Sequence, residues 1–135
     1  MKKIIFASLA TLLLIAPLSA DQTQRAKLSS DMRSMLAAME LIQKAGFYND
    51  HKMMTNGVND LKNGLESLKS SDAKEYLPKD QAYADKFAQK RAKMIDMYAD
   101  DILTSLKEKN MDDALEDYIQ ILKQCTSCHS RIRSY

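Results

Sequence analysis

The chain has 135 residues, of which 45% are hydrophobic and 28% are charged, and its formal net charge is +2. A nucleic-acid-binding domain would show clustered basic residues and a strong positive charge, so this composition excludes nucleic acid as an expected partner. With three glycines and two prolines, the sequence also lacks the turn-forming residues that a many-stranded protein needs. The composition therefore favours an all-helical protein.

The first twenty residues have the order of a secretory signal peptide. Lys2 and Lys3 precede a mainly apolar run, and a short Leu-Ser-Ala ending follows a proline. We expect cleavage after Ala20, which leaves one domain of residues 21–135 in the bacterial periplasm. The apolar run is shorter than the roughly 20 residues of a membrane-spanning helix, so no span is expected after cleavage. An uncleaved N-terminal anchor is the alternative.

Apolar residues recur at steps of three and four over four segments of this domain, which is the pattern of amphipathic helices. The expected helices cover residues 22–47, 49–69, about 80–109 and 111–132, and Gly46 is expected to end the first. The apolar stripes that define them are Leu28, Met32, Met35, Met39 and Ile42; Met54, Val58, Leu61, Leu65 and Leu68; Phe87, Met94, Tyr98, Ile102 and Leu106; and Met111, Leu115, Tyr118, Leu122, Cys125, His129 and Ile132.

Four amphipathic helices with mostly short connections bury their stripes most economically in an antiparallel, up-down-up-down four-helix bundle. Gly57 and Gly64 weaken the second helix by about 1 kcal/mol each relative to alanine, so packing must stabilise it. In such a bundle the first and fourth helices lie side by side and antiparallel. The start of the first helix is therefore expected near the end of the fourth.

The sequence Cys125-Thr126-Ser127-Cys128-His129 has the spacing of a c-type haem attachment motif. On a helix, residues three and four apart lie on one face. The two sulfurs can then form thioethers with the two porphyrin vinyl groups, while the imidazole of His129 binds the iron from the same side. We therefore expect one covalently attached haem c, with Cys125, Cys128 and His129 as its binding residues.

Two other kinds of site use a Cys-x-x-Cys pair. A redox-active dithiol is expected near the start of a helix in a strand-helix-strand unit, whereas this motif lies at the end of a helix in an all-helical chain. A tetrahedral zinc site needs a fourth ligand, and His51, the only other histidine, lacks metal-ligand spacing to the motif. A third alternative is a haem-free helical module in which His129 is a packed core residue.

An attachment motif on the last helix of a four-helix bundle resembles the class II cytochromes c, which include the cytochromes c-prime and the cytochrome c-556 type. The segment from Cys125 to Arg133 is similar to the family's Cys-x-x-Cys-His-x-x-aromatic-Arg, with Ile132 in place of the aromatic residue. The resemblance implies that Arg133 belongs to the haem-binding motif and that the protein transfers electrons. No catalytic triad or phosphate loop points to an enzyme.

The resemblance also implies that a residue of the first helix decides the function at the sixth iron position. A methionine ligand, for which Met32 is the first choice and Met35 the second, suits electron transfer because His/Met ligation raises the reduction potential. An apolar residue there would instead give five-coordinate iron that binds nitric oxide or carbon monoxide. Arg25 or Arg33 is the expected partner of a haem propionate.

Lys123, Arg131 and Arg133 are expected to form a positive rim around the haem, which would attract a redox partner with an acidic docking surface. The same residues also complement the dipole at the end of the fourth helix. The sequence leaves the oligomeric state open, a homodimer included.

Overall fold

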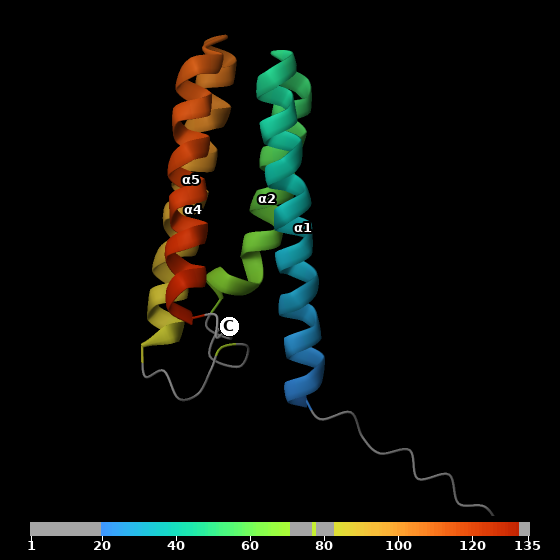
Figure 1. Cartoon of the computed structure of the whole chain (residues 1–135), viewed down its shortest axis with the longest axis vertical. Coiled ribbons are helices and arrows are strands. Elements are labelled where there is room, and N and C mark those ends of the chain that lie inside the picture. The colour runs from blue at the N-terminus through green and yellow to red at the C-terminus, as the bar shows by residue number, and fades with distance from the viewer. Residues whose placement is uncertain (1–19, 71–76, 78–82, 133–135) are drawn as a thin grey trace, which may run out of the picture.

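The computed structural model describes residues 20–70, 77 and 83–132, with side chains from residue 25 onward, and in this part of the chain all regular secondary structure is helical. Its four helices are α1 (Ala20–Tyr48), α2 (His51–Lys69), α4 (Ala84–Lys107) and α5 (Met111–Ile132) (Figure 1). Successive helices pack against each other, which confirms the predicted all-α class and the four-helix bundle.

The turn between α1 and α2 lies later than the sequence predicts. Gly46 does not end α1, because the helix continues to Tyr48 and the left-handed conformation falls on Asn49, at φ 50°. Asparagine tolerates this conformation at a helix C-terminus. The carboxylate of Asp50 then accepts a hydrogen bond from the N–H of Met53 at 2.9 Å and caps α2.

The turn between α4 and α5 also combines a residue in the left-handed conformation with a side-chain cap on the next helix. Lys109 adopts a φ of 60°, and the N–H of Asn110 donates to the carbonyl of Ser105 at 2.9 Å. The side-chain oxygen of Asn110 accepts from the N–H of Asp113 at 3.2 Å and caps α5. Both turns therefore reverse the chain tightly, as an antiparallel bundle requires.

Two glycines of α2 face α1 directly. A Cβ on Gly57 would lie 2.8 Å from Cγ1 of Ile42 and 3.2 Å from the carbonyl oxygen of Ala38, and a Cβ on Gly64 would lie 2.5 Å from Cγ of Met35. No side chain fits in these positions without movement, so the glycines let the two helices approach closely. This close contact between α1 and α2 is the packing that was expected to offset the low helix propensity of the two glycines.

The core side of α4 agrees with the predicted stripe at Ile102 and Leu106 and differs from it elsewhere. Phe87, Met94 and Tyr98 are only partly buried, because small residues carry the contact with the rest of the bundle. The buried residues of this helix are Ala84, Ala88, Ala92, Ile95, Ala99, Ile102 and Leu106. Alanines allow α2 and α5 to pack close to the α4 backbone.

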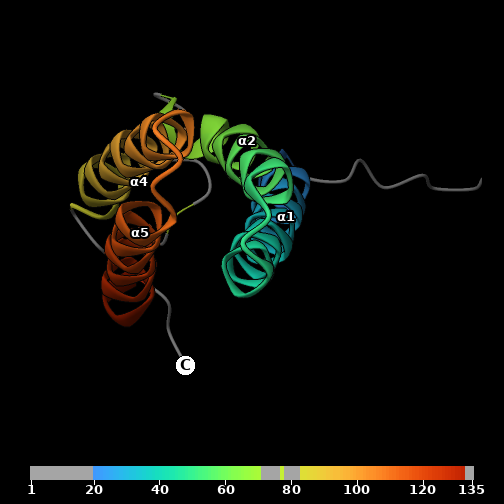
Figure 2. The ribbon, with the colours of Figure 1, turned by 90° about the horizontal axis from the view of Figure 1, so that it is seen from above.

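The bundle is less closed between α1 and α5 than elsewhere. The pairs α1/α2 and α4/α5 pack tightly and meet where α2 lies against α4, whereas α1 and α5 contact each other over a short stretch (Figure 2). Part of that stretch lies near Gly46, where an added Cβ would be 2.6 Å from Cδ2 of Leu115. This end of α1 is the one far from His129.

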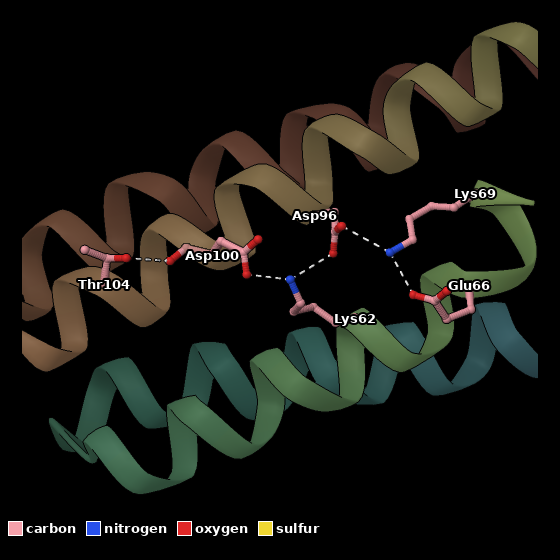
Figure 3. A network of polar contacts seen from close by, with 6 residues as sticks. All are labelled: Lys62, Glu66, Lys69, Asp96, Asp100 and Thr104. Carbon is pink, nitrogen blue, oxygen red and sulfur yellow. Dashed lines mark hydrogen bonds and ion pairs between the residues drawn. The ribbon is translucent and has the colours of Figure 1, made fainter.

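Ion pairs connect α2 to α4 across the joint between the two helix pairs (Figure 3). Asp96 lies between Lys62, at 3.0 Å, and Lys69, at 3.1 Å. Burial alone would raise the pKa of Asp96, but the hydrogen bonds and charges of the two lysines outweigh it and hold this pKa below its ordinary value. The ionised carboxylate therefore stabilises the folded state.

We predict that Gly57→Ala destabilises the protein. Alanine would stabilise an isolated helix by about 1 kcal/mol, but here the methyl group overlaps Ile42 and the backbone of Ala38, which costs about 1–3 kcal/mol of overpacking. Urea unfolding measures the free energy, and Asn59→Ala at an exposed position of α2 serves as the control. Equal stabilisation by both substitutions would contradict the close helix contact.

Asp96→Asn should lower the free energy of unfolding by about 1 kcal/mol at pH 7, because these ion pairs are only partly buried. The depressed pKa means that the stabilisation is complete above the unfolded-state pKa of about 3.9 and is lost as the pH falls through the lower folded-state value. The difference from the unsubstituted chain should therefore shrink below about pH 4. Asp60→Asn, at an exposed position of α2, should show neither effect, and a pH-independent difference would refute the assignment.

Candidate functional site

The Cys-x-x-Cys-His motif lies in the last two turns of α5. Cys125, Cys128 and His129 are all half-buried, and both cysteines are free thiols. Their spacing places them on one side of the helix. Of the three, Cys128 and His129 face the weakly closed part of the bundle.

A cavity of about 610 Å³ opens beside the motif. Its volume falls within the roughly 300–1,000 Å³ of pockets that bind cofactors and small molecules. Residues of all four helices surround it, together with Leu77 of the segment between α2 and α4. The lining residues are Arg25, Leu28, Ser29, Met32, Arg33, Leu36, Leu68, Leu77, Ala88, Cys128, His129 and Ile132.

Of the residues expected to bind the iron, two line this cavity. His129 contributes from α5 and Met32 from α1, so the fold brings the expected proximal and distal ligands to one space. Met35 does not reach it. Its side chain is 8% exposed and packs against Gly64 of α2, in the interface between α1 and α2.

The start of α1 contributes the polar part of the lining. Arg25, Ser29 and Arg33 all border the cavity, and the guanidinium of Arg33 donates a hydrogen bond to the hydroxyl of Ser29 at 2.9 Å. These are the two arginines expected to bind a propionate. Guanidinium groups form bidentate hydrogen bonds with carboxylates, so either residue has the chemistry for such a contact.

Leu36 is a lining residue that sequence reasoning missed. It lies four residues after Met32 on α1 and is 61% exposed, a high value for a leucine that borders a cavity. The spacing Leu28, Met32, Leu36 would have identified this second apolar stripe beside the core-facing one. A bound apolar group in the cavity would cover it.

The two thiols differ in their surroundings. Cys128 lines the cavity, whereas Cys125 packs against the main core, next to Tyr118, and is not among the lining residues. Burial, reinforced by the charge of the neighbouring Cys128, raises the pKa of Cys125 to about 11. Burial also raises the pKa of Cys128, although Arg91 opposes the shift. Both groups are therefore neutral thiols near pH 7.

The raised pKa values of the two thiols weaken the redox-dithiol alternative. A redox-active dithiol depends on a lowered thiolate pKa, typically at the start of a helix, whereas this motif ends one. Among the described residues no group of three or more His, Cys, Asp or Glu side chains could hold a metal ion. His51 lies at the start of α2, beside a different surface depression that Lys52 and Lys107 also line.

Some expected features lie outside the described part of the chain. These are Arg133, which follows the last described residue of α5, and most of the predicted signal peptide. No helix in the described ranges is both long and apolar enough to cross a membrane. Lys123 and Arg131 are exposed on the last turns of α5, and the guanidinium of Arg131 lies 4.9 Å from the centre of the Phe87 ring.

Comparison of the chain with protein-family models, with curated proteins and with solved structures finds no match. The functional argument therefore depends on the residues of the motif and the cavity beside it.

Proposed function

We propose that this protein is a periplasmic, monohaem c-type cytochrome that carries single electrons between redox proteins. Haem c would be attached through Cys125 and Cys128, with His129 as the proximal iron ligand. The observation that supports this most strongly is the 610 Å³ cavity in which the motif's histidine and second cysteine meet a methionine from another helix. The predicted signal peptide of residues 1–20 supports export to the periplasm.

The residues present fit a haem in their chemistry. Leucines, Ala88 and Ile132 offer apolar walls to a porphyrin, while Arg25 and Arg33 lie where the carboxylates of the propionates could be bound. The bound group would supply one-electron redox chemistry at its iron. The protein's own residues would orient it, exclude water from its apolar faces and hold it covalently.

Cys125 requires a local adjustment under this proposal. Its thiol packs beside Tyr118 rather than in the cavity lining, so thioether formation would turn it from the core toward the cavity. It lies one turn before Cys128 on the same helix. A side-chain rotation and small shifts of α5 are the expected changes.

Met32 is the distal ligand that we propose, in preference to Met35. The thioether of Met32 belongs to the cavity lining, whereas that of Met35 is committed to packing against α2. Ligation by a histidine and a methionine gives six-coordinate iron and a raised potential, which suits an electron carrier. The alternative is a five-coordinate, gas-binding protein, in which Met32 would only pack near the iron.

The proposal predicts a covalent haem on the exported protein. When the full chain is produced in bacteria with a c-type cytochrome maturation system, the mass of the periplasmic protein should exceed that of the processed chain by one haem. The added mass should map to the peptide that contains Cys125 and Cys128. His51→Ala is the control and should retain it, whereas a periplasmic chain with unmodified cysteines would refute the proposal.

Substitution of the two methionines separates the ligand from the packing residue. Met32→Ala should remove the far-red methionine-to-iron charge-transfer band of the oxidised protein and allow carbon monoxide to bind the reduced form. Met35→Ala should keep the band but destabilise the bundle by about 2–5 kcal/mol, because it leaves a cavity against Gly64.

Optical spectra and urea unfolding of both variants test this assignment. Carbon monoxide binding by the unsubstituted protein would favour the gas-binding alternative. Loss of the band in Met35→Ala with retention in Met32→Ala would reverse the ligand assignment.

A further inference from the structure

Arg91 of α4 is a half-buried cation that reaches the helix carrying the Cys-x-x-Cys-His motif. Its guanidinium donates a hydrogen bond to the side-chain oxygen of Gln124 at 2.5 Å. Gln124 is 6% exposed and directly precedes Cys125 in α5. The contact therefore holds a positive charge against the turn of α5 in which the motif begins.

The same guanidinium lies against the ring of Phe87, one turn earlier on α4. The distance from the guanidinium carbon to the ring centre is 4.7 Å, and Arg131 of α5 approaches the same ring at 4.9 Å. Phe87 belongs to a small apolar cluster, and four other members of this cluster line the candidate haem cavity: Leu77, Ala88, Cys128 and Ile132. Only one layer of side chains thus lies between Arg91 and the wall of the cavity.

No carboxylate neutralises Arg91 in the part of the chain that the structure describes. Its hydrogen bond there goes to the neutral amide of Gln124, and its Nε–H is buried without a partner. Asp96, on the same helix, is paired with Lys62 and Lys69. A charge withdrawn from water costs free energy unless it is paired. Packing of α4 against α5 therefore does not account for the positive charge of this side chain.

The position of Arg91 also differs from that of the two arginines expected to bind a propionate. Arg25 and Arg33 line the cavity and could contact a bound group directly, whereas Arg91 is not a lining residue. Its charge could therefore act on a group in the cavity through the apolar cluster of Phe87. An electrostatic interaction of this kind is weakly screened, because apolar side chains rather than water lie in between.

We infer that Arg91 raises the reduction potential of the haem proposed above, as a fixed positive charge behind the wall of the cavity. The inference rests on the proposed function, because it requires a haem attached to Cys125 and Cys128. Reduction removes one positive charge from an iron porphyrin, so a nearby cation stabilises the reduced form relative to the oxidised form. Arg91 acts at a distance and is neither an iron ligand nor a catalytic residue.

Burial distinguishes Arg91 from the other cations at this end of the bundle. Arg131 and Lys90 are exposed, so water and dissolved ions screen their charges. Arg91 is half-buried and is held between Gln124 and Phe87. Its effect on the potential should therefore exceed that of the exposed cations and should persist at high salt.

Redox titration of the haem-loaded protein tests this role. Arg91→Gln removes the charge and should lower the equilibrium constant for reduction on the order of tenfold, which is a fall of about 59 mV for a one-electron couple. Arg91→Lys retains the charge and should keep most of the potential. Lys93→Gln makes the same charge change at an exposed position of α4 and should leave the potential nearly unchanged.

Gln124→Met separates the charge of Arg91 from its hydrogen bond. This variant loses the acceptor and keeps the cation, so it should unfold at a lower urea concentration but shift the potential much less than Arg91→Gln does. The optical spectrum of the oxidised protein should be the same in all four variants, because none of them replaces a proposed iron ligand.

The inference is supported if the potential falls in Arg91→Gln, is retained in Arg91→Lys and is unchanged in Lys93→Gln. A haem-loaded Arg91→Gln protein with an unchanged or higher potential would overturn it and leave the proposed function intact. An equal fall in Gln124→Met would assign the effect to the hydrogen bond and would also overturn it. A purified periplasmic chain without haem would contradict the inference and the proposed function together.

Discussion

The structure depends on an apolar surface between α1 and α5 that the described protein atoms leave partly uncovered. Leu36 on α1 is 61% exposed and Leu122 on α5 is 45% exposed, and Leu122 lies on the same face as His129, seven residues before it. Apolar area left in water forgoes about 25 cal/mol per Å². A bound apolar group would recover this free energy, so the proposed haem would be a component of the core as well as a redox centre.

Two tight helix pairs maintain that opening. Gly57 and Gly64 bring α2 close to α1, and the alanines of α4 bring it close to its neighbours. Asp96, between two lysines, joins the pairs along the opposite side of the bundle. Because the close contacts lie between α1 and α2, between α2 and α4 and between α4 and α5, the helices α1 and α5 can diverge toward the end that carries Met32 and His129.

Periodicity predicted the four helices, their order and the meeting of Met32 with the motif, because these follow from spacing and chain reversal. On α4 it placed Ile102 and Leu106 correctly in the core but missed the buried alanines, since alanine is only weakly apolar and Phe87 or Tyr98 outweighs it in any hydrophobic pattern. On α5 the buried residues are Ala114, Ile121, Gln124 and Ile132, so most of the predicted stripe lies along the edge of the core. The sequence already placed Met32 before Met35, but the packing of Met35 against Gly64 is a contact between helices that one sequence cannot reveal.

Proton NMR of the reduced protein tests the central claim most directly, because a porphyrin shifts the resonances of methyl groups that lie against it. If haem occupies the cavity, the methyl groups of Met32, Leu36 and Ile132, which line it, should show large ring-current shifts. The methyl group of Met54, which is fully buried in α2 and is not a lining residue, should not. Unshifted Met32 and Leu36 resonances in a haem-containing sample would contradict the account.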